Sequence, residues 1–259
     1  MTLALLLACA HRRDGAGDDA PSPALAEGDA LWATRASDPA ALDAAVERWL
    51  AATADDPEDP APLARLSRAE WVRALTRPDE AAEALETGTE YGWRCLYAFP
   101  AFASAAAVSG YRVDEEAVGT LGRDAVPCLA WLANNGLDRV ALRGPGGALD
   151  LEGLALVVRR AAALAPAGEG GMVARAEARW LVLTGGDRAA ARAAFERAIA
   201  AEPGFLLFRV DLAEAFPDEA VALPEASSPD PWALENAAAR ARAKKDEAPG
   251  DAAGGSQAP

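Results

Sequence analysis

Two segments far apart in the chain repeat one spacing of small and aromatic residues. The shared pattern is Ala, an aromatic residue, Ala and Pro, at intervals of four, three and five positions. It occurs at Ala45, Trp49, Ala52 and Pro57, and again at Ala191, Phe195, Ala198 and Pro203. Intervals of four and three place the first three residues on one face of a helix, and proline cannot continue a helix interior. The pattern therefore predicts helices that pack closely against a partner helix and then stop.

This spacing is that of the second helix of a tetratricopeptide repeat, a unit of two antiparallel helices and about 34 residues. Gly186 stands where the turn between the two helices is expected, at a position suited to left-handed backbone geometry. The two matches are 146 positions apart, whereas four regular repeats would occupy roughly 136. We therefore expect an all-α fold of tetratricopeptide-like antiparallel helix pairs, an α-solenoid, over residues 27–245 and irregular in its middle.

Composition agrees with an all-α fold. Hydrophobic residues make up 51% of the 259 residues but aromatic residues only 6%, so the apolar content is mostly Ala, Leu and Val. Ala and Leu are strong helix formers. The formal net charge of −15 repels a phosphate backbone, so nucleic acid is not expected as a partner.

The chain lacks the usual catalytic and metal-binding motifs. His11 is the only histidine, which removes serine–histidine and cysteine–histidine catalysis and histidine-based metal sites from the body of the chain. The sequence contains no HExxH, GxSxG, P-loop lysine or CxxC motif. We therefore expect a protein without enzymatic activity, cofactor or metal ion.

The N-terminal sequence MTLALLLAC has the form of a bacterial lipoprotein signal. Leu6-Leu7-Ala8-Cys9 matches a lipobox, in which the Cys9 thiol receives the lipid. Residues 1–9 are then the signal, and residues 10–26 form a flexible tether rich in Gly, Pro, Asp and Ser. The alternative is an unstructured tail that happens to contain a cysteine. A lipidated Cys9 would anchor the chain without a spanning helix, and Ala10 after it favours the outer membrane.

The remaining cysteines and the far end of the chain also carry expectations. Cys95 and Cys128 lie in apolar helical segments. Buried cysteines are often free, whereas an exported protein could oxidise the two to a disulfide, and the sequence does not decide between these states. Residues 246–259 are expected to be a disordered acidic and Gly-rich tail.

The segment VPCLAWLANNG, residues 126–136, is interpreted first as a helix. Asp124 is placed to cap its start, Pro127 falls in the first turn, and the Asn-Asn-Gly ending supplies a stop, which predicts a helix over 124–135. Trp131 and Asn135 are one helical turn apart, so this helix could also line a groove.

The order of motifs resembles that of the TRAP-transporter T-component (TatT) lipoproteins. The lipobox is followed by the first repeat, by LARLSRAEW and by a long helical segment ending in ALETGTEYGWRCL. VPCLAWLANNG corresponds to the family's helix with Trp and Asn, and the second repeat and the ending PDPWALEN complete the order over residues 1–245. The resemblance implies a periplasmic, lipid-anchored protein that forms homo-oligomers and works with the substrate-binding (P) component of a TRAP transporter.

Two kinds of non-enzymatic function remain open. One is the accessory role that the resemblance implies, and the other is a carrier of a small hydrophobic ligand or a general interaction scaffold at the outer membrane. For either role we take Trp93, Trp131, Asn134 and Asn135 as candidate groove residues. The other tryptophans are expected to fill helix–helix contacts.

Overall fold

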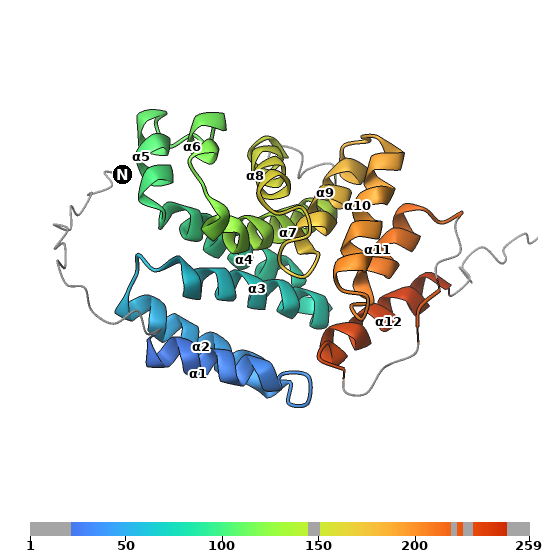
Figure 1. The fold of residues 1–259 in the computed structure, drawn as a ribbon. Coiled ribbons are helices and arrows are strands. Elements are labelled where there is room, and N and C mark those ends of the chain that lie inside the picture. Colours follow the sequence, from blue (N-terminus) through green and yellow to red (C-terminus); the bar gives the residue numbers. More distant parts are fainter. Residues whose placement is uncertain (1–21, 145–150, 219–221, 225–229, 248–259) are drawn as a thin grey trace, which may run out of the picture.

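A computed structural model describes residues 22–144, 151–218, 222–224 and 230–247, and within them every regular element is a helix. This confirms the predicted all-α class (Figure 1). The expected signal with Cys9, His11 and most of the tether lie outside the described residues, as does most of the expected tail. No described helix is both long and apolar enough to cross a membrane.

The helices stack as pairs along a curved array (Figure 1). The first pairs are α1 with α2 and α3 with α4, and a later pair is α9 with α10. The irregular middle consists of the short helices α5 and α6, the central helix α7 and α8. The bounds are α1 Pro23–Thr34, α2 Ala40–Asp55, α3 Pro60–Thr76, α4 Ala81–Tyr97, α5 Pro100–Val108, α6 Glu115–Gly119, α7 Val126–Arg143, α8 Leu151–Leu164, α9 Met172–Leu183, α10 Arg188–Ala201, α11 Leu207–Ala215 and α12 Ala233–Glu247, with 3-10 turns at Pro78–Glu80 and Arg123–Ala125.

The two ends of the array meet at α3. Helix α12 packs on α11, which precedes it, and also on α3 (Figure 1). Helix α7 contacts α3, α4, α8 and α9 and so runs through the centre. A strictly linear solenoid joins each repeat only to its neighbours, whereas this array curls until segments from both ends of the chain face one another.

The repeat residues lie at helix contacts. Ala45, Trp49, Ala52, Ala191, Phe195 and Ala198 are all buried. Helices α2 and α10 end shortly before Pro57 and Pro203. The left-handed residue after α9 is Gly185, with φ of 65°, and not Gly186 as expected. The Gly185 amide donates to the Val182 carbonyl, and the Gly186 amide donates to the Leu181 carbonyl. This is the Schellman pattern of helix ends, which requires left-handed backbone geometry at the first of the two residues, here Gly185.

Both ends of the helical domain extend beyond the expected boundaries. Helix α1 begins at Pro23 and not at residue 27, because the Ser22 side chain accepts a hydrogen bond from the Leu25 amide and caps the first turn. Helix α12 continues to Glu247, into the segment expected to be a disordered tail.

Helix α7 does not stop at Asn134-Asn135-Gly136 but continues to Arg143. Both asparagines are fully buried and donate back to the carbonyl four residues earlier, so their amides satisfy the helix and do not end it. Gly136 is needed for packing, since a Cβ there would lie 2.6 Å from a methyl group of Leu154 on α8. At the other end, Asp124 does not cap α7, because it belongs to the preceding 3-10 turn.

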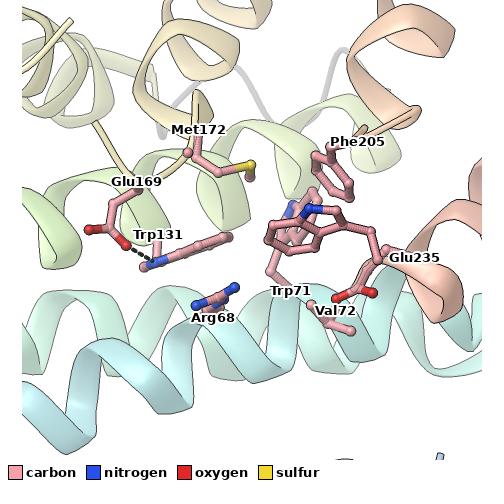
Figure 2. Close-up of a pocket in the computed structure, with 10 residues that line it drawn as sticks. Arg68, Trp71, Val72, Trp131, Glu169, Met172, Phe205 and Glu235 are labelled. Carbon is pink, nitrogen blue, oxygen red and sulfur yellow. Dashed lines mark hydrogen bonds between the residues drawn. The ribbon is translucent and has the colours of Figure 1, made fainter. Parts of the chain in front are cut away.

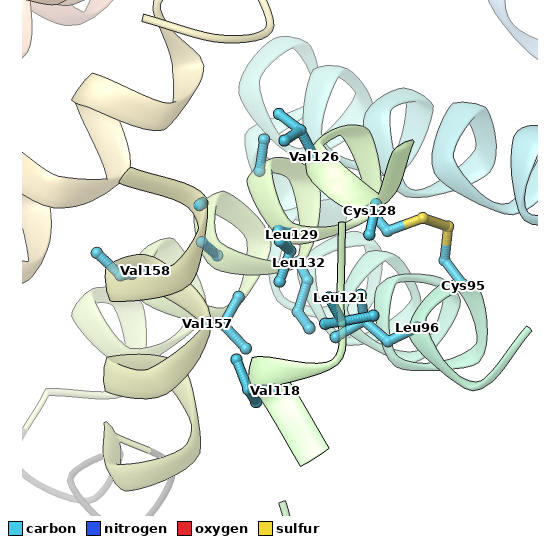
Figure 3. Packing of buried hydrophobic residues seen from close by; sticks show 14 of the residues in the cluster. Cys95, Leu96, Val118, Leu121, Val126, Cys128, Leu129, Leu132, Val157 and Val158 are labelled. Carbon is cyan, nitrogen blue, oxygen red and sulfur yellow. A yellow bond between two sulfur atoms is a disulfide. The ribbon is translucent and has the colours of Figure 1, made fainter. Parts of the chain in front are cut away.

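Two glycines allow α4 and α7 to approach closely. A Cβ at Gly88 would lie 2.3 Å from the Asn135 side-chain oxygen, and one at Gly92 would lie 2.9 Å from the Cα of Leu132. The same two helices are joined by a disulfide between Cys95 and Cys128, with Cα atoms 5.6 Å apart (Figure 3). The pair left open by the sequence is therefore oxidised, and it lies in a core that also contains Leu96, Leu129 and Leu132.

Candidate functional site

Two adjoining cavities, of about 430 and 340 Å³, lie where the ends of the array face one another. We call them together the Trp–Arg groove. They share Arg68 of α3, Trp131 of α7 and Glu169 of the turn before α9 (Figure 2). The larger is also lined by Trp71, Val72, Gly170, Met172, Phe205, Trp232 and Glu235, and the smaller by Asp29, Trp32, Trp49, Ala64, Arg65 and Pro127.

The walls of the groove are aromatic. The ring centroids of Trp71 and Trp131 are 5.7 Å apart, and those of Phe205 and Trp232 are 4.8 Å apart. Trp71 and Phe205 connect the two pairs at 6.4 Å. These distances are typical of favourable tilted aromatic contacts, so the rings form one continuous apolar surface built by α3, α7 and the segments before α11 and α12.

Two acidic side chains hold the indole rings in place. The Trp71 Nε1 donates to Asp138 at 2.8 Å, and the Trp131 Nε1 donates to Glu169 at 3.2 Å (Figure 2). Glu169 has left-handed backbone geometry, with φ of 51°, which is uncommon for a residue with a side chain. The sharp turn before α9 therefore places this carboxylate at the groove.

The Asp138 carboxylate is in turn held by cations from the core. Arg175 and Arg179 of α9 approach it at 3.0 and 3.1 Å. Burial alone would raise the pKa of Asp138, but Arg175, Arg179, the hydrogen bond from Trp71 and the charge of Arg242 together lower it. Arg175 is itself buried and bonds Asp211 at 2.6 Å. A charged network thus fixes Trp71 in one orientation.

Arg68 lies at the centre of the groove and is surrounded by indole rings. Its guanidinium carbon is 4.6 Å from the ring centroid of Trp32, 5.3 Å from that of Trp131 and 5.8 Å from that of Trp232. Its Nε is shielded from solvent, and no hydrogen bond or ion pair within residues 22–144, 151–218, 222–224 and 230–247 involves the guanidinium. Burial, helped by nearby Arg35, lowers the pKa of Arg68 to about 10, so the group stays charged at neutral pH.

The other two arginines at the groove are paired. Arg35 binds Glu235 at 2.8 Å in a fully buried ion pair that joins α1 to α12. Arg65 binds Asp29 at 2.6 and 2.9 Å through two of its nitrogens. Arg35 also packs on the Trp32 and Trp232 rings, so Arg68 differs from both neighbours in that no carboxylate of the described residues bonds it.

The structure brings only part of the expected groove set together. Trp131 lines both cavities. Asn135 is buried behind it and donates to the backbone carbonyl of Ser67, while Asn134 accepts from Arg175 and donates to the carbonyl of Met172. The asparagines therefore fasten α7 to α3 and α9, and they do not line the groove.

Trp93 lies elsewhere. It is half-buried on α4 and packs against the cluster formed around α7 and α8, close to Gly153. Trp93 is not among the residues that line the two cavities of the Trp–Arg groove, because its side chain packs toward α8.

Several groove residues were not singled out from the sequence, above all Arg68, Trp71 and Trp232. A signal was available in LARLSRAEW, where Arg68 and Trp71 lie three positions apart and so share one helix face. What could not be seen is that α1 and α12 bring two more tryptophans to that face.

Chemically, the groove combines a flat apolar surface with the Arg68 guanidinium, which bonds no carboxylate in the part of the chain that the structure describes. Among the described residues, no group of three His, Cys, Asp or Glu side chains could hold a metal ion. In comparisons with known proteins, no family model and no curated protein matches the chain significantly.

Proposed function

We propose that the protein is a non-enzymatic, lipid-anchored binding protein of the bacterial periplasm that acts as an accessory component beside the substrate-binding protein of a TRAP-type transporter. The observation that carries the binding role is the Trp–Arg groove, where distant helices converge on an aromatic surface. Helical-repeat proteins use concave surfaces of this kind for recognition. The choice of partner rests on the order of sequence motifs that resembles the TatT lipoproteins.

The groove chemistry favours binding over catalysis. The Glu235 Oε1 binds Arg35, while the Glu235 Oε2 is buried without a hydrogen-bond donor among the described residues. The Glu169 carboxylate accepts a hydrogen bond from the Trp131 indole. An acid or base needs a reacting group within hydrogen-bond reach and a nucleophile needs a base beside it. Among the described residues, those that line the groove include no Ser, Cys, His or Lys.

The disulfide supports a location outside the cytoplasm. Disulfides persist in oxidising compartments such as the periplasm and are rare where thiols are kept reduced. Cys95 and Cys128 form such a bond in the core. Together with the lipobox ending at Cys9, this favours an exported protein anchored by lipid, with the outer membrane as the proposed site. Homo-oligomer formation stays a prediction of the resemblance.

A second candidate function is a carrier for a small ligand. The larger cavity, about 430 Å³, falls within the range typical of small-molecule sites. Apolar walls with few polar groups are also typical of such sites. In this role the groove would hold its ligand directly, without a protein partner.

Affinity capture from the native envelope tests the two candidates. We expect the tagged full-length chain, cross-linked in cells and solubilised in detergent, to recover a TRAP substrate-binding protein. Trp232→Ala should reduce recovery, whereas Trp93→Ala should not, since both rings are partly buried but only Trp232 lines the groove. Failure to recover any TRAP component would refute the accessory role, and an organic molecule released from the denatured protein would favour the carrier.

The anchor is tested in the same cells. Cys9→Ser should move the protein from the membrane fraction to the soluble periplasmic fraction, because no other lipid attachment point is expected. A variant that stays in the membrane fraction after a salt wash would contradict lipidation at Cys9.

A further inference from the structure

The unpaired charge of Arg68 indicates what the groove binds. Removing a guanidinium from water is costly unless hydrogen bonds and a counter-charge replace the lost hydration. Arg35 and Arg65 have such partners in Glu235 and Asp29, but Arg68 has only the faces of three indole rings. Cation–π contacts occupy the faces of a guanidinium and do not satisfy the N–H groups in its plane. Arg68 is half-buried, and its Nε–H is shielded from solvent without an acceptor among the described residues.

The two nearby carboxylates do not fill this role. Two nitrogens of Arg35 hold the Glu235 Oε1, and among the described residues neither oxygen of Glu235 bonds Arg68. Glu169 is held by the indole of Trp131 and by its left-handed backbone. Both still favour the charged form of Arg68 from a distance. The groove thus keeps a protonated guanidinium and leaves its hydrogen-bond donors available.

The surroundings of Arg68 restrict the shape of a ligand. Trp131, Met172 and Phe205 lie around the space above the Arg68 guanidinium (Figure 2). Flat indole surfaces favour a flat apolar body. The planar fork of a guanidinium matches the two oxygens of a carboxylate and binds them through parallel hydrogen bonds.

We propose that the Trp–Arg groove binds a small organic carboxylate with a flat apolar body, with the carboxylate on the Arg68 guanidinium and the body against Trp131 and Trp232. This inference rests on the proposed function as a binding protein and names the ligand class of the same groove. Glu169 faces the same space, so its charge opposes the ligand and sets a limit on affinity.

The test compares 2-naphthoate with 2-naphthamide, which has the same shape and no charge. We expect calorimetric titration of the purified full chain to show naphthoate binding at least about tenfold more tightly, the effect of a charged hydrogen-bonded pair. Acetate, which has the charge without the flat body, should bind far more weakly than naphthoate. Equal binding of naphthoate and naphthamide, or no binding of either, would overturn the proposal without any variant.

Variants locate the site. Arg68→Gln should remove the preference for the acid over the amide, and Arg68→Lys, which keeps the charge but not the fork, should retain part of it. Glu169→Gln should tighten naphthoate binding while preserving the acceptor for Trp131. The control is Arg159→Gln, because Arg159 is exposed on α8 and lines neither cavity of the groove. An unchanged acid preference in folded Arg68→Gln would refute the assignment.

The outcomes separate the two proposals. Naphthoate binding without capture of a TRAP component refutes the accessory role but keeps the ligand class. Capture of a TRAP component without an acid preference refutes the ligand class alone.

Discussion

Reduction of the Cys95–Cys128 disulfide is expected to destabilise the protein by about 3.7 kcal/mol. The bond closes a loop with a sequence separation of 33. In the chain-entropy relation, a disulfide lowers the conformational entropy of the unfolded chain by an amount that grows with the logarithm of the loop length. For a loop of this size, the resulting stabilisation of the folded protein is about 3.7 kcal/mol at 25 °C. Such a loss is a large fraction of the roughly 5–15 kcal/mol that keeps a domain folded.

Urea unfolding followed by circular dichroism measures this effect. With a urea dependence of about 2–3 kcal/mol per molar, the reduced protein should unfold at a midpoint lower by about 1–2 M than the oxidised protein. The double variant Cys95→Ala/Cys128→Ala is the control for the reductant, because it has no bond to reduce and its midpoint should not respond to reductant.

Two results would refute the reasoning. Equal midpoints for the oxidised and reduced protein would show that the bond does not constrain the unfolded chain. A free thiol in denatured, unreduced Cys9→Ser protein would show that Cys95 and Cys128 are not joined, since these are the only other cysteines.

Two further predictions concern the packing of α7 and the charges behind the groove. Gly92→Ala should destabilise the protein by about 1–2 kcal/mol, since crowding against the Leu132 backbone outweighs the gain in helix propensity. Gly119→Ala on α6 meets no atom within 4 Å and should be neutral or slightly stabilising in the same urea assay; equal effects of both would contradict the close approach of α4 and α7. The pKa of Asp138 is lowered in the folded protein, so the native state binds fewer protons at this carboxyl than the unfolded state does. The ion pairs of Asp138 therefore stabilise the fold above pH 3.8, the ordinary pKa of an aspartate, and this stabilisation is lost as the pH falls below 3.8. The unfolding free energy of wild type should therefore fall more steeply below pH 3.8 than that of Asp138→Asn, and parallel curves would contradict the assigned ion pairs.

The candidate site could be predicted only in part. Trp131 is a candidate from the sequence because it lies one helical turn from Asn135 and corresponds to the Trp of the TatT helix. Asn134 and Asn135 have the same local signature but serve to join helices, and a sequence pattern does not distinguish an amide that faces a groove from one that bonds a neighbouring carbonyl. Trp93 lies outside the Trp–Arg groove, and the sequence could not show this because the direction of a helix face depends on which helices pack around it.

Local rules were sufficient for the helices and the repeat contacts. Spacings of three and four placed Trp49 and Phe195 on buried helix faces, because helix periodicity is a property of the backbone itself. They failed at α7, where burial of both asparagines against α3 and α9 overrode the stop that Asn-Asn-Gly usually makes.

The amino-acid sequence by itself determined that the chain is helical and that paired helices stack, because these follow from composition and local spacing. Only the tertiary structure decided that Cys95 and Cys128 join and that Arg68 lies among three tryptophans, with no ion pair to any described residue. Trp32 and Trp232 are two hundred positions apart, and they meet at Arg68 because the array curls until α12 packs on α3. That curvature arises from the summed packing of every intervening helix, which no local pattern contains.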